Sequence, residues 1–204
     1  SDNLKLRIEF QDSRTERVDS GTFLNNTMIN PAELLEANVQ WNAENLFADG
    51  SKSVLRAGRI TMDVGSRRLV ARNRFRNVLE GFSGLDGIWQ AGNGNQVRTF
   101  YTLSVNRLPN QQNGLARNDV VMDKESLDRR FWGLYVASPN LPGGHWGELY
   151  FFGLQQNENL DLLIQSRQLY TPGVRVSRPK VKGQFDYEME SALQFGVSRD
   201  AVTN

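Results

Sequence analysis

The feature that most constrains the fold is an alternation of apolar and polar residues with a period of two. Residues 3–11 give the clearest case, because every second residue there is apolar and the others are charged or carry an amide. The apolar set is Leu4, Leu6, Ile8 and Phe10, and the polar set is Lys5, Arg7, Glu9 and Gln11. Successive side chains of a β-strand point to opposite faces, so the pattern predicts a strand between an apolar and a polar medium.

The same pattern recurs along the chain and predicts about nine strands in an all-β protein. We expect them at residues 3–11, 34–47, 52–63, 82–90, 96–107, 130–138, 146–156, 174–178 and 184–195. In the segment 146–156 the expected apolar face carries Trp146, Tyr150, Phe152 and Leu154, although Glu148 interrupts it. The connection 157–170 is long enough to hold a short helix in its middle.

The connections between these segments alternate in length. Those at 12–33, 64–81, 108–129 and 157–173 are long, whereas those at 48–51, 91–95, 139–145 and 179–183 are short. Outer-membrane barrels have short periplasmic turns, long extracellular loops and aromatic residues near the strand ends of the apolar face. The pattern therefore favours an antiparallel, up-and-down transmembrane β-barrel. A soluble β-sandwich with a polar outer face would alternate in the same way and stays open.

Composition argues against several other classes of protein. No apolar run approaches the length of a transmembrane helix, and no signal peptide opens the chain. Cys is absent and His145 is the single histidine, which disfavours a metal site or a Ser-His-Asp triad. Glu188 and Glu190 share a strand face, but such pairs are typical of a polar wall. We therefore expect no enzyme and no cofactor, and the net charge of +1 disfavours nucleic acid as a partner.

An arginine-rich stretch is the strongest candidate for function. Its seven arginines are Arg56, Arg59, Arg67, Arg68, Arg72, Arg74 and Arg76, and Asp63 is the one acid between them. A guanidinium group is permanently charged, and its fork of donors matches a carboxylate or a phosphate. Inward-facing arginines would make a channel favour anions. Alternatively, the arginines pair with acids of the same wall, and the candidates are Glu36, Glu44, Asp63, Asp186, Glu188 and Glu190.

Two stretches of the sequence resemble the alginate-export family of outer-membrane β-barrels. They are GSRRLVARNRFRN, followed by F-x-G-L-D-x-x-W, within residues 65–89, and QFDYEMESALQFG at residues 184–196. The resemblance spans nearly the whole chain and is absent from the long loops. It implies that residues 1–204 belong to a single barrel domain of a Gram-negative bacterium. We expect them to form roughly half of that barrel, with a signal peptide and closing strands outside the sequence.

The resemblance also implies a function, partners and site residues. The function is passive, anion-selective passage of an anionic polysaccharide such as alginate, or of another anionic solute, through the outer membrane. Outer-membrane lipid and periplasmic export components are the implied partners. A general or small-solute porin and a soluble carbohydrate-binding β-sandwich are the alternatives. The residues expected to line the pore are Arg7, Glu9, Arg59, Asp63, Arg68, Arg72, Arg74, Arg76 and Arg98.

Overall fold

The computed structural model describes residues 3–17, 19, 21–160 and 164–199, and nearly all of its regular structure is β. The strands are β1 (Leu4–Ser13), β2 (Asn30–Glu44), β3 (Lys52–Ile60), β4 (Phe82–Gln90), β5 (Gln96–Ser104), β6 (Arg129–Leu141), β7 (His145–Gln156), β8 (Arg167–Arg178), β9 (Tyr187–Ala192) and β10 (Phe195–Ser198). One short helix, α1 (Gln112–Ala116), lies in the connection between β5 and β6.

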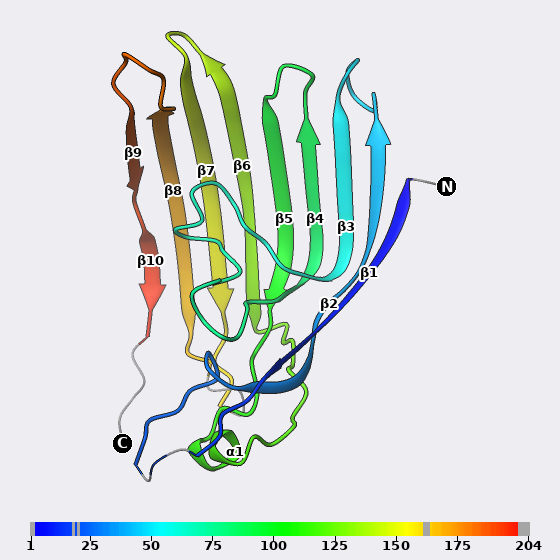
Figure 1. Ribbon diagram of the computed structural model, residues 1–204, viewed down its shortest axis with the longest axis vertical. Helices are drawn as coiled ribbons and strands as arrows, with labels where there is room; N and C mark the ends of the chain where they lie inside the picture. The colour runs from blue at the N-terminus through cyan, green and yellow to red at the C-terminus, as the bar shows by residue number, and fades with distance from the viewer. Residues whose placement is uncertain (1–2, 18, 20, 161–163, 200–204) are drawn as a thin grey trace.

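All ten strands join one antiparallel sheet in which strands β1 to β8 lie in chain order and β8 pairs with both β9 and β10 (Figure 1). β9 and β10 are two halves of one pass, because both pair with β8. The break between them lies opposite Pro172 of β8, whose nitrogen carries no hydrogen to donate to the ladder. The described chain thus crosses the sheet nine times, which confirms the expected up-and-down meander and is consistent with a fragment of a β-barrel.

The structure differs from the predicted elements in the region around β8. This strand begins at Arg167, whereas the sequence prediction began at residue 174, because Pro172 and Gly173 gave the signal of a turn. The helix expected within residues 157–170 is not seen in the described part of that connection, which forms an isolated bridge between Asn159 and Ile164. Residues 161–163, at the middle of that expected helix, lie outside the described residues.

One face of the sheet is apolar and exposed to its surroundings. Its large side chains come from nearly every strand and include Leu6, Ile8, Val39, Leu55, Leu85, Leu134, Leu149, Val174, Met189 and Val197. Near the end with the long connections, four rings form a continuous chain with centroids 5.6–6.2 Å apart, and these are Trp132, Phe151, Tyr170 and Phe195. Gly153 makes room for this chain, since a Cβ there would lie 2.2 Å from the Trp132 ring.

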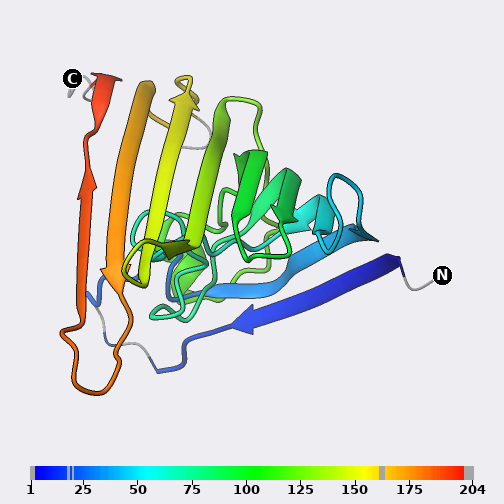
Figure 2. The same ribbon diagram turned by 90° about the horizontal axis from the view of Figure 1, so that it is seen from above.

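The opposite face is concave and holds the connection between β3 and β4, which we call segment 61–81 (Figures 1 and 2). At one edge of the sheet, Leu79 N–H donates to Gln11 Oε1 of β1 over 3.0 Å. At the other edge, Arg68 forms ion pairs with β9. A single connection can contact strands at both edges because the sheet curves around it.

The apolar core lies between segment 61–81 and the concave face. Val64 and Val70 form an isolated bridge with each other and belong to a buried cluster with inward-facing rings of β5, β6 and β7. The buried rings of this cluster are Phe82, Phe100, Tyr135, Tyr150 and Phe152. The segment therefore gives aromatic side chains of the concave wall a dry surface to contact.

This core reverses the face expected for residues 146–156. Tyr150 and Phe152 point into the concave side and are buried, whereas Leu149 is exposed on the apolar outer face. The sequence pattern did not reveal that a distant connection would cover the inward rings. Glu148, which interrupted the expected apolar face, was the local sign that this side faces inward.

Candidate functional site: a charged concave wall

Ion pairs cross the concave wall from strand to strand. On β1 and β2, Arg7 Nε lies 2.6 Å from Glu36 Oε2, and Glu36 is almost fully buried. In the middle of the sheet, Asp86 of β4 is fully buried between two arginines of its neighbours. Its Oδ2 lies 2.5 Å from Arg56 Nη2, and its Oδ1 lies 2.7 Å from Arg98 Nε.

The same arrangement continues on the far side of the sheet. Arg175 of β8 stands opposite Glu148 of β7 and Glu190 of β9 in the strand register. It pairs with Glu148, and its Nη2 lies 3.1 Å from Glu188 Oε2. We call the whole series the charge ladder, and its members are Arg7, Glu36, Arg56, Asp86, Arg98, Glu148, Arg175, Glu188 and Glu190.

Asp63 organises the arginines of segment 61–81. Its Oδ1 accepts a hydrogen bond from the backbone N–H of Arg72 over 3.1 Å, and its Oδ2 lies 3.1 Å from Arg74 Nη2. Its carbonyl oxygen accepts from Arg98 Nη1 over 2.7 Å, which ties the segment to the ladder. Burial by itself would raise the pKa of Asp63, but the backbone N–H and the charges of Arg72 and Arg74 outweigh it and hold the pKa below its ordinary value.

Three other arginines of segment 61–81 do not contact Asp63 in the described part of the chain. Arg68 reaches across the concavity, with Nη1 2.9 Å from Glu190 Oε2 and Nη2 3.0 Å from Glu188 Oε1. Arg67 and Arg76 are exposed, and neither forms a salt bridge within the described part of the chain. They are therefore the arginines of the run whose charge is available to an external anion.

Arg59 lies apart from these groups. It is three residues from Arg56, so strand alternation places it on the other side of β3. It pairs with Glu33, and its Nη2 lies 2.8 Å from Glu125 Oε1 of the connection between β5 and β6. Of the residues predicted to line a pore, the structure thus gathers Asp63, Arg72, Arg74 and Arg98 and links Arg68 to β9. It places Arg7 near the other edge of the sheet, paired with Glu9 of β1 and Glu36 of β2.

The long-loop end holds a second buried network around Asp123. Its Oδ1 accepts from Leu108 N–H over 2.7 Å and its Oδ2 accepts from Asn30 Nδ2 over 2.9 Å. Its own N–H donates to Glu33 Oε2 over 2.8 Å. Burial raises the pKa of Asp123 to about 6, and the negative charge of Glu33 adds to the rise, while the hydrogen bonds from Leu108 and Asn30 oppose it.

Three charged residues of the ladder were not proposed for the site by the sequence prediction: Asp86, Glu148 and Arg175. Arg56 belonged to the arginine-rich run but was not among the residues expected to line the pore. The signal that could have found the other three is a lone charge within an apolar stretch of strand. Asp86 follows the outward Leu85, and Arg175 lies between Val174 and Val176. Such a charge must face the polar side of the strand.

The fold and the charged wall together define the class of protein. It is a curved, up-and-down antiparallel sheet with an exposed apolar face and a charged concave face. The family model for alginate export matches residues 1–204, and the chain belongs to this family. Membership in this family makes the protein a polysaccharide export channel.

No curated protein and no solved structure matches the chain. Among the described residues, no helix has the length and apolarity needed to cross a membrane. In the same part of the chain, no three His, Cys, Asp or Glu side chains gather as ligands for a metal ion.

Proposed function

We propose that the protein is an outer-membrane channel, and not an enzyme, that passes an anionic polysaccharide such as alginate by passive diffusion. The observation that carries the proposal is the contrast between the two faces of one sheet. Exposed residues such as Leu6, Leu55 and Leu149 suit the hydrocarbon of outer-membrane lipid, and the charge ladder suits water. Periplasmic export components are the proposed partners that deliver the polymer.

Anion selectivity would arise from cations that lack an acid of their own. In the ladder each arginine has a carboxylate within ion-pair distance, which lowers the field that it exerts on a passing solute. Arg67 and Arg76 have no such partner among the described residues, and Arg72 and Arg74 share the single carboxylate of Asp63. A narrow passage strengthens the attraction of these charges for a polyanion.

Reversal potential across a salt gradient tests the proposal, with the full-length protein in a planar bilayer. We expect an anion-selective conductance that added polyuronate blocks. Arg76→Gln should lower the ratio of anion to cation permeability, and replacing Arg72, Arg74 and Arg76 together should lower it further. Arg117→Gln is the matched control, because Arg117 is exposed in another loop and already pairs with Asp119.

Each other result would change the assignment in a defined way. Unchanged selectivity in the triple variant would leave these arginines with a structural role only. A nonselective or cation-selective pore would favour a general porin of the same fold. Correctly folded protein without conductance, and without a requirement for an amphiphile, would favour the carbohydrate-binding β-sandwich.

A further inference from the structure

Three arginines lie near one another where the connection between β5 and β6 meets the concave wall. Arg129 of β6, Gln156 of β7 and Arg167 of β8 are successive partners in the strand register, so they form one row on the concave face. Arg107 approaches this row from the connection between β5 and β6. Among the described residues, the charges of Arg107 and Arg167 act on the Arg129 guanidinium together with that of one acid, Glu80.

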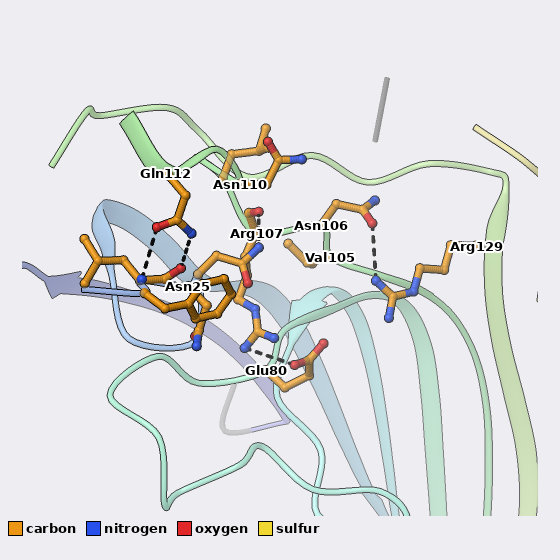
Figure 3. A pocket seen from close by; sticks show the side chains of 12 residues that line it. Asn25, Glu80, Val105, Asn106, Arg107, Asn110, Gln112 and Arg129 are labelled. Carbon is orange, nitrogen blue, oxygen red and sulfur yellow. Dashed lines mark hydrogen bonds and ion pairs between the residues drawn. The ribbon is translucent and has the colours of Figure 1, made fainter. Parts of the chain in front are cut away.

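The polar atoms of this row are incompletely paired. Arg129 Nη1 donates to Asn106 Oδ1 over 3.3 Å, but Arg129 Nε is buried and has no hydrogen-bond partner among the described residues (Figure 3). Within the same part of the chain, Arg167 Nε and Gln156 Oε1 are also buried without a partner. Glu80 Oε2 lies 3.2 Å from Arg107 Nη1, so it is already engaged by a different arginine. Buried guanidinium groups left without acceptors are unfavourable, and an added acceptor would stabilise them.

A cavity opens beside these groups and has room for a ligand. Its volume is about 350 Å³, and it is bounded by three long connections and by Arg129 (Figure 3). The side-chain amides of Asn25 and Asn110 also line it and can donate hydrogen bonds, whereas the Gln112 amide is bonded to the backbone of Leu24. A second cavity of about 390 Å³ lies beneath segment 61–81, and Arg129 and Glu80 line both.

We propose that the first cavity binds a compact oxyanion, the carboxylate or phosphate group of a ligand, between Arg129 and Arg107. The planar fork of an arginine matches both groups, and the amides supply further donors. Arg167 adds to the attraction from the neighbouring strand, and Glu80 opposes it. This site is separate from the charge ladder, and the proposal does not depend on transport through the channel.

Calorimetric titration of the full-length protein in detergent tests the site, with inorganic phosphate in one series and acetate in the other. We expect saturable binding in at least one series. Arg129→Gln should weaken it about tenfold or more, which is the scale of one charge-assisted hydrogen bond. Arg130→Gln is the matched control, because Arg130 is the next residue, points to the other side of β6, and donates to the Leu127 carbonyl over 2.8 Å.

A second variant should change the binding affinity in the opposite direction. Glu80→Gln removes the acid that competes for Arg107, so it should tighten binding several-fold, which a general loss of structure would not do. Binding in the phosphate series alone would identify phosphate groups as the ligand class, and binding of acetate alone would identify carboxylates. Non-saturable heats in both series, or equal affinities in the Arg129→Gln and Arg130→Gln proteins, would overturn the proposal.

Discussion

Replacing Asp86 by Asn tests whether the charge ladder holds the wall together. Asp86 is fully buried, and its two carboxylate oxygens contact Arg56 and Arg98 over 2.5 and 2.7 Å. The amide is nearly the same size but carries no charge, so the variant leaves two guanidinium groups without a counterion in the middle of the sheet. We expect the free energy of unfolding to fall.

The magnitude follows from the burial of the pair. At an effective dielectric constant near 20, each guanidinium–carboxylate contact has a gross attraction of about 4 kcal/mol. The substitution removes both the charge of Asp86 and the free-energy cost of desolvating that charge, but the two arginines remain desolvated. Removal of one partner of a buried ion pair costs about 3 to 5 kcal/mol. We expect the loss to fall in that range.

Denaturant unfolding of the full-length protein in detergent, followed by tryptophan fluorescence, measures the loss. Asp119→Asn is the control, because Asp119 also pairs with an arginine but does so at the surface, where the change should have almost no effect. If the two variants unfold at the same denaturant concentration, the central pair does not stabilise the wall and our account of the ladder is wrong.

Three further predictions concern other parts of the fold. Gly153→Ala should displace the Trp132 ring, destabilise the sheet by about 1 to 3 kcal/mol and shift the tryptophan emission, whereas Gly87→Ala, whose Cβ would meet its neighbours at 3.8 Å, should be tolerated. Val70→Ala should weaken the segment between β3 and β4 by about 2 kcal/mol, and this would be seen as faster amide exchange confined to that segment. Because the folded protein raises the pKa of Asp123 from 3.8 to about 6, its contribution to stability is complete below about pH 4 and is lost as the pH rises through about 6. The stability difference between the wild type and Asp123→Asn should therefore change by up to roughly 3 kcal/mol over that interval, because this difference isolates the contribution of Asp123.

Much of the fold was predictable because period-two alternation is a local property. The limits of β4 agree with the prediction, and β1 differs only at its ends, since both strands pair with strands that are their neighbours along the chain. β8 was missed over its first half because Pro172 reads locally as a turn. The sheet accommodates Pro172 because the paired strand is interrupted there, between β9 and β10. The local sequence around Pro172 does not show this interruption.

The site was less predictable, because ion pairs join residues far apart in the sequence. Alternation correctly placed Arg98 on the charged side, but nothing near it in the chain indicated that Asp86 would be its partner. The arginine-rich run showed where the positive charge lies. It did not show that Arg68 would reach β9, because that contact depends on how the segment folds back into the concavity.

The charge ladder has a consequence for how the sheet assembles. Arg56 lies directly opposite Asp86, and Arg175 lies directly opposite both Glu148 and Glu190. If a strand pairs one residue out of register, every one of its side chains moves to the other face of the sheet. A charged side chain would then lie on the apolar face, and its ion-pair partner would be left without a counterion. The ladder therefore adds an electrostatic penalty to every out-of-register pairing of these strands, beyond the penalty from exposing polar groups to the apolar surroundings.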